Sequence, residues 1–288
     1  MYPAQFDYLR ASSVEEALQL LGEHEDAKLI AGGHSLIPMM KLRLAQPATV
    51  IDIGRIDALK GVSVDGGSVR IGALTTHNAI AASSQLAEHA ALVAEAAGHI
   101  GDNQVRNRGT IGGNIAHADP GSDLPATLLA TGATIHLQGP SGARTVASED
   151  FFIDLLMTDL GEDEVVTAIE IPSLAAREGK TGSAYLKFEH PASGYAVVGA
   201  AAFVTVDDSG RCTGAGLALN GATAAPLDGS AVAAALVGSA PTDEAIDAAA
   251  SSLVVDEPMG DLFASEEYRA HLAKVYAKRA LKAARDRT

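Results

Sequence analysis

The sequence predicts an α+β chain in three consecutive parts: residues 1–56 and 57–176 as two subdomains, and residues 177–288 as an antiparallel sheet with helices. Three observations lead to this fold class. In the first part a helix pattern accompanies two strand patterns, and in the second part strand patterns appear in which apolar residues alternate with polar ones. In the third part long strand patterns precede Ala-rich helical stretches.

The first part has the pattern of a small α/β unit. Ser13-Val14-Glu15-Glu16 has the form of a capping box, and apolar residues follow at helical spacing until Gly22 ends the predicted helix. Buried strands are predicted at Lys28–Ala31 and Thr49–Ile53. A helix together with strands predicts a small α/β domain in this part.

The second part begins near Gly61, where apolar residues alternate with polar ones. Thr76 is a candidate helix cap for a region rich in Ala, Leu and Glu that runs to about His99. Mixed α+β structure with antiparallel pairing is predicted here. The strand candidates are Ala133–Leu137, Arg144–Ala147 and Val165–Ile171.

The third part follows a polar segment, Leu174–Thr181, which is typical of a connection between domains. Strands are predicted at Ser183–Glu189, Ala196–Val206 and Thr213–Asn220, and helices at Ser230–Leu236, Asp243–Leu253 and Glu266–Ala284.

Charge and cysteine content restrict the function. A formal net charge of −15 disfavours a general nucleic-acid or anionic-membrane role. The single Cys212 cannot form an internal disulfide or ligate an iron–sulfur cluster by itself. The N-terminus lacks a signal-peptide pattern and no apolar run has the length of a membrane span, so we expect a cytoplasmic protein.

The first candidate site is the glycine-rich loop Ala31-Gly32-Gly33-His34-Ser35, which follows a predicted strand. Adjacent glycines allow backbone N–H groups to approach an anion without a Cβ atom in the way, and phosphate is the natural ligand. A Gly-Gly pair after a strand is also typical of an ordinary turn. The loop lacks the spacing of a dinucleotide fingerprint or a P-loop.

The second candidate is more distinctive: Gly109-Thr110-Ile111-Gly112-Gly113-Asn114, followed by an acidic segment. Thr110 and Asn114 can hydrogen-bond phosphate or sugar oxygens, and Asp123 can accept from ribose hydroxyls. Ser122 is a candidate cap for a helix through Leu129.

These loops resemble those of the FAD-binding medium subunits of carbon monoxide dehydrogenases and of the wider xanthine dehydrogenase family of molybdenum hydroxylases. The resemblance covers the whole chain. It is carried by four segments: Phe6-Asp7-Tyr8, the run from Ala31 to Pro38, the run from Asn107 to Asn114, and the run from Lys187 to Tyr195.

The resemblance implies a two-part FAD-binding domain of the vanillyl-alcohol-oxidase type, with FAD bound noncovalently. Both loops would hold the FAD pyrophosphate, Asp123 and Lys187 would lie near the cofactor, and Tyr195 would lie beside the isoalloxazine. The implied cofactor-binding residues are Ala31, Gly32, Gly33, His34, Ser35, Leu36, Thr110, Ile111, Gly112, Gly113, Asn114, Asp123, Lys187 and Tyr195.

The resemblance also implies a hetero-oligomer. A large molybdopterin-binding subunit would oxidise the substrate, and a small iron–sulfur subunit would relay electrons to FAD in this chain, which would pass them to an external acceptor. Molybdenum cofactor and iron–sulfur clusters are expected only in these partners. Two alternatives stay open: a self-contained flavin oxidase of related fold, and a non-enzymatic nucleotide-binding scaffold subunit.

Other patterns give weaker hypotheses. No residue stands out as a catalytic acid or base, so no catalytic residue and no metal site is predicted. His117, Asp119 and Asp123 could in principle bind a metal, and His34 could carry a covalent flavin link. Basic residues beside the loops could neutralise phosphate or lie in solvent: Lys41, Arg43, Arg106 and Arg108.

Overall fold

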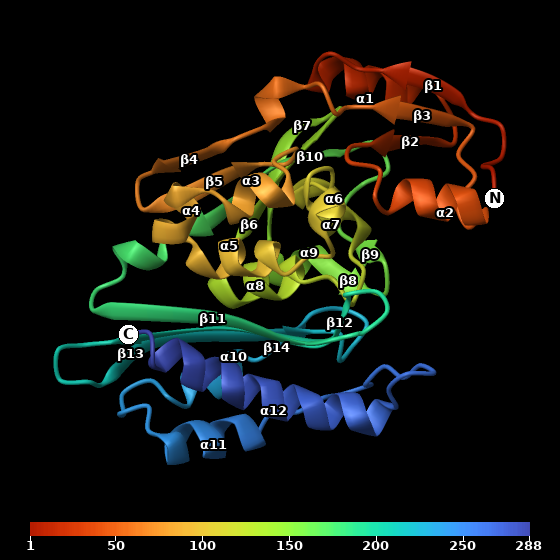
Figure 1. Ribbon diagram of the computed structural model, residues 1–288. Helices are drawn as coiled ribbons and strands as arrows, with labels where there is room; N and C mark the ends of the chain where they lie inside the picture. The colour runs from red at the N-terminus through yellow and green to blue at the C-terminus, as the bar shows by residue number, and fades with distance from the viewer.

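Three main β-sheets follow one another along the chain in the computed structural model, which describes residues 1–288 (Figure 1). A fourth sheet has only two short strands, within residues 152–158. The first sheet is parallel, with strand order β1-β3-β2. Its elements are β1 (Asp7–Arg10), α1 (Val14–Glu23), β2 (Ala27–Ile30), α2 (Leu36–Leu42) and β3 (Thr49–Asp52). The predicted α/β unit is therefore present, and β1 is an addition that the strand patterns did not predict.

Helix α1 begins where the capping pattern placed it. The Ser13 hydroxyl accepts from the Glu16 N–H at 3.1 Å, and the Glu16 carboxylate accepts from the Ser12 N–H at 2.7 Å. Both bonds satisfy amide groups that the start of a helix leaves unpaired. The helix packs its apolar face, including the fully buried Ala17, against the first sheet.

The second sheet is antiparallel, with strand order β4-β5-β10-β6-β7. The predicted helical region before His99 is three helices, because Ser83 caps a new helix with its hydroxyl. The elements are η1 (Asp57–Leu59), β4 (Val62–Asp65), β5 (Ser68–Gly72), α3 (His77–Ala81), α4 (Ser84–His89), α5 (Ala91–Gly98), α6 (Asn103–Arg106), α7 (Ile111–His117), α8 (Leu124–Thr131), β6 (Thr134–Gly139), β7 (Gly142–Ala147), α9 (Ser148–Phe151), β8 (Phe152–Asp154), β9 (Met157–Thr158), β10 (Val165–Pro172) and η2 (Leu174–Ala176).

The third sheet is antiparallel and lies between two helical layers (Figure 1). Helices α5 and α8 of the second part cover one face, and the C-terminal helices cover the other. Every residue of β12 is buried, which explains why its sequence is continuously apolar rather than alternating. The elements are β11 (Lys180–Glu189), β12 (Ala196–Val206), β13 (Cys212–Asn220), β14 (Leu227–Asp228), α10 (Ser230–Ala234), α11 (Asp243–Ser251) and α12 (Glu266–Arg285).

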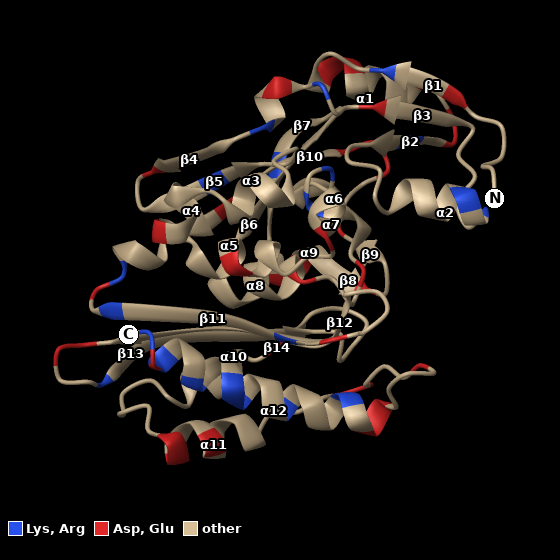
Figure 2. Ribbon diagram, viewed as in Figure 1, with Lys and Arg blue, Asp and Glu red and all other residues tan.

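Opposite charges connect α11 to α12 on the outer face of this layer (Figure 2). The Lys282 ammonium lies 2.9 Å from carboxylate oxygens of both Asp243 and Asp247. These partly exposed pairs contribute modestly to stability, so the buried apolar face of α12 is the main attachment of the helix.

The α+β fold class is confirmed, with the antiparallel C-terminal sheet and its helices. The polar segment at Leu174–Thr181 is shorter than predicted, because η2 occupies its start and β11 begins at Lys180. The division of the chain after residues 56 and 176 stays a prediction. No helix combines the length and the apolar character that crossing a membrane requires, and a cytoplasmic location also stays a prediction.

Candidate cofactor site

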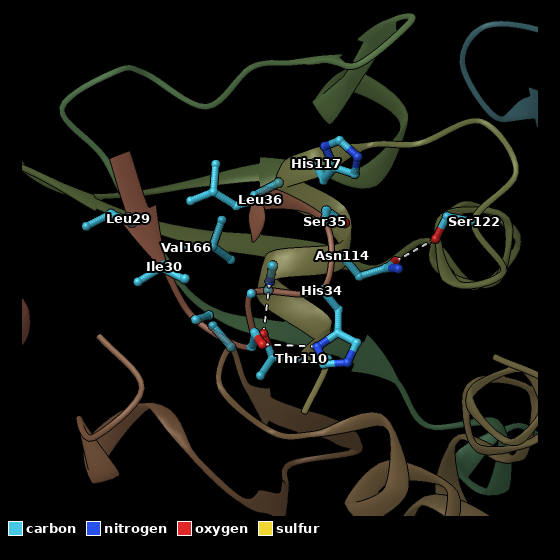
Figure 3. A pocket seen from close by; sticks show the side chains of 18 of the residues that line it. Leu29, Ile30, His34, Ser35, Leu36, Thr110, Asn114, His117, Ser122 and Val166 are labelled. Atoms are coloured by element: carbon cyan, nitrogen blue, oxygen red, sulfur yellow. Dashed lines mark hydrogen bonds between the residues drawn. The ribbon is translucent and has the colours of Figure 1, made fainter. Parts of the chain in front are cut away.

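A cleft of about 690 Å³ lies where the first sheet, helix α7 and the loop before β12 meet. The two glycine-rich loops, which are far apart in the sequence, form adjoining walls of this cleft (Figure 3). Of the residues that sequence analysis proposed for cofactor binding, all except Ile111 and Lys187 line it. Ile111, the first residue of α7, is fully buried, and the Lys187 side chain is only 3% exposed.

The first loop presents a row of free backbone donors. The N–H groups of the five consecutive residues from Gly32 to Leu36 have no acceptor within the chain. Gly33 adopts φ of 75°, a left-handed conformation that favours glycine. Successive amides around such a residue form a concave anion-binding nest. This loop fits a phosphate group or another anion.

Gly32 has a further role that the sequence did not reveal. A Cβ atom there would overlap the carbonyl oxygen of Arg108 and lie 2.9 Å from Cα of Gly109. Gly109 in turn lies against the His77 imidazole, 2.8 Å from where its own Cβ would be. These glycines therefore allow the two loops to touch each other, in addition to leaving room for a ligand.

The second loop is the start of a helix. The Thr110 hydroxyl accepts from the Gly113 N–H at 3.3 Å, so Thr110 is the N-cap of α7. The amides of Ile111 and Gly112 donate to carbonyl oxygens of Thr75 and Ala73, at 3.1 and 2.8 Å. Since these amides are already paired, the first loop supplies most of the free donors in the cleft.

Asn114 and Ser122 bond to each other across the cleft wall (Figure 3). The Ser122 hydroxyl donates to Oδ1 of Asn114 at 2.8 Å, which leaves the Asn114 amide hydrogens available to a ligand. The predicted helix cap at Ser122 is wrong. Asp123 precedes α8 instead and makes no side-chain cap, because both side chains are engaged elsewhere.

Asp123 lies in a buried polar network. Its carboxylate accepts from the Tyr185 hydroxyl at 2.6 Å and from the Lys187 ammonium at 3.2 Å, and it is 4% exposed. Burial raises the pKa of Asp123 to about 6, although the charge of Lys187 and the Tyr185 hydrogen bond act in the opposite direction. Tyr185 could not be identified from the sequence, since a tyrosine within a strand carries no signal of this contact.

The structure does not support the hypotheses of a metal site or of basic residues that neutralise phosphate in the cleft. No group of three or more His, Cys, Asp or Glu side chains is placed to hold a metal ion, and Asp119 instead accepts from the Gly121 N–H at 2.9 Å. None of the four basic residues beside the loops lines the cleft. Arg106, for example, donates to the Ile100 carbonyl at 2.9 Å.

His77 is a buried histidine in the cleft wall that sequence analysis also missed. It is 3% exposed, and its Nδ1 has no hydrogen-bond partner. Burial lowers its pKa to about 4, with smaller contributions from His34 and Arg106. The imidazole is therefore neutral at physiological pH.

A pH prediction follows from His77. Between pH 6.5 and about 4 the unfolded chain binds a proton at this residue and the folded chain does not, so stability falls as pH falls. We expect His77→Leu to remove roughly 2 kcal/mol of the stability that is lost between pH 7 and pH 4.5. Urea unfolding at pH 7 and pH 4.5 measures it, with His271→Leu at an exposed position as the control. An equal pH dependence in wild type and His77→Leu would contradict the assignment.

Two family models together match most of the chain. Residues 4–174 match the FAD-binding domain in molybdopterin dehydrogenase, and residues 183–284 match the CO dehydrogenase flavoprotein C-terminal domain. The chain belongs to this family. The family resemblance, the oxidoreductase class and FAD as cofactor are thereby confirmed.

Curated relatives and a solved structure support the same family assignment. The carbon monoxide dehydrogenase medium chain of Hydrogenophaga pseudoflava is 44% identical, over 99% of this chain and 98% of that one. The medium chain of Afipia carboxidovorans is 39% identical, over 100% and 99%. A structure of the Hydrogenophaga pseudoflava enzyme that lacks the Mo-pyranopterin moiety superposes with a TM-score of 0.95 and 45% identity, over 100% of this chain and 99% of that one.

Proposed function

We propose that this chain binds FAD noncovalently in the cleft and serves as the electron-transfer subunit of a molybdenum hydroxylase complex. The observation that carries the proposal is the row of five unpaired amides from Gly32 to Leu36. A pyrophosphate supplies the acceptors that these donors lack, and leaving buried or half-buried donors unpaired is costly.

Other residues of the cleft support the orientation of FAD. The Asn114 amide lies on the adjoining wall, where it can donate to the same phosphates or to ribose. Tyr195, which is 46% exposed, also lines the cleft, and an aromatic side chain there can pack beside the isoalloxazine. FAD in this position would supply the exchange between single-electron and paired-electron transfer.

The chain needs partners for its chemistry. Its single cysteine is buried and cannot hold a cluster, so we assign the iron–sulfur clusters to a small partner subunit. The relatives are medium chains of carbon monoxide dehydrogenases, and we infer a large molybdenum subunit by the same comparison. The choice of substrate then belongs to that large subunit.

The test compares the isolated chain with the native complex. We expect the FAD-loaded chain alone to oxidise no carbon monoxide, purine, aldehyde or N-heterocycle. Its flavin absorbance should bleach when a reduced iron–sulfur partner is added. Acid precipitation should release free FAD into the supernatant, because no covalent link is expected at His34.

Two outcomes would contradict the proposal, and each would favour one of the alternative functions. Turnover of a small molecule with oxygen by the chain alone would favour the self-contained oxidase. A purified chain that fails to bind FAD in a titration would favour the scaffold subunit.

A further inference from the structure

The Lys187 side chain on β11 is buried and fully occupied by the protein. Its Nζ donates to the His99 carbonyl at 2.8 Å, to the Gly194 carbonyl at 2.7 Å and to Asp123 at 3.2 Å. An ammonium group has three hydrogens, so these acceptors use all of them. No donor is left for a ligand.

The three acceptors lie on separate segments. His99 ends α5, Asp123 precedes α8, and Gly194 belongs to the loop of residues 190–195 that joins β11 to β12. Lys187 therefore fastens this loop to the second part of the chain at a single buried point. The only cleft residues from the third part are Ser193, Gly194 and Tyr195 of the same loop.

The loop has few other attachments. Its internal bonds run from the His190 N–H to the Tyr195 carbonyl and from the Gly194 N–H to the His190 carbonyl, at 2.8 and 2.9 Å. One bond outside the loop follows it, from the Ala196 N–H to the Gly121 carbonyl at 3.1 Å. The His190 ring also packs against Phe263, with ring centroids 4.4 Å apart. An exposed loop with so few contacts outside itself opens readily, so loss of the ammonium should release its Gly194 and Tyr195 end.

We propose that Lys187 is a positioning residue that holds the loop of residues 190–195, and with it Tyr195, at the mouth of the cleft, with Asp123 as its counter-ion. This deepens the proposed function and rests on it for the role of Tyr195. Lys187 acts through the loop rather than through a direct bond to the cofactor.

The charge balance around the ammonium supports this role. Asp123 is the only carboxylate bonded to Lys187, and Tyr185 and Glu189 are the other groups that affect the pKa of Asp123. Removing one member of such a pair leaves the other as an unpaired buried charge, which is strongly destabilising. Replacing both with neutral groups avoids that penalty.

The experiment measures hydrogen exchange of residues 190–196 in the full chain, without FAD and with FAD. We expect Lys187→Met to speed exchange of the His190, Gly194 and Ala196 amides at least tenfold, with little change in the strands of the second sheet. Lys180→Met, an exposed position on the same strand, is the matched control and should match wild type. FAD affinity is measured in parallel by titration.

The double variant Asp123→Asn with Lys187→Met serves if Lys187→Met does not fold. It leaves no unpaired buried charge, and it should still show fast exchange in the loop because the bond to Gly194 is gone. Unchanged loop exchange together with weaker FAD binding would overturn the proposal and make Lys187 a direct ligand. Because exchange in the FAD-free chain tests the loop by itself, failure of FAD binding in wild type would refute only the proposed function.

Discussion

Gly32→Ala should leave the chain unable to retain FAD. The added Cβ would overlap the Arg108 carbonyl oxygen. The Cβ is fixed to the backbone of residue 32 and the oxygen is itself a backbone atom, so neither can move aside as a flexible side chain could. The first loop must then separate from the second, and the five amides that form the anion site lose their arrangement. We expect FAD to bind at least about 100-fold more weakly, a loss of about 2.7 kcal/mol.

Flavin absorbance after gel filtration and a fluorescence titration measure this loss. Gly22→Ala is the matched control, since Gly22 lies in helix α1 with open space around its Cβ position. That variant should bind FAD as wild type does and gain slight helix stability. Retention of stoichiometric FAD by Gly32→Ala would show that the contact between the loops is not needed for binding.

Arg269→Met should produce the largest loss of stability. This guanidinium is buried in α12, and its Nη1 donates to the carbonyls of Val197 and Gly221 at 2.6 and 2.8 Å, while Nη2 contacts Asp261 at 2.5 Å. Methionine fills the space but leaves both buried carbonyl oxygens without a donor. We expect a loss of about 3 kcal/mol in the free energy of unfolding.

Urea unfolding followed by circular dichroism measures this loss. Lys274→Met changes an exposed residue of the same helix and should cost under about 0.5 kcal/mol. Equal unfolding midpoints for the two variants would contradict the role of Arg269. Because the contacts of Arg269 lie in the third part of the chain, FAD affinity at low urea should change little.

The amino-acid sequence determined the elements with local signals. The capping pattern at Ser13, the strand runs of the third part and the helix of residues 266–284 are set by neighbouring residues, and all of them occur in the structure. Both glycine-rich loops were also found, because adjacent glycines allow backbone conformations and close contacts that other residues do not. Strand β1 and helix α7 were missed, since their short segments carry no clear periodicity.

Only the tertiary structure decided how these elements form a site. The sequence predicts that glycine at position 32 leaves room for an anion. It does not predict that the same glycine makes room for the backbone of Arg108, which lies 76 residues further along the chain. The contacts of Asp123 with Tyr185 and of Lys187 with Gly194 likewise depend on how the third sheet packs on α5 and α8. Local sequence fixes backbone preference, whereas burial and long-range contacts fix which polar groups remain free to bind a ligand.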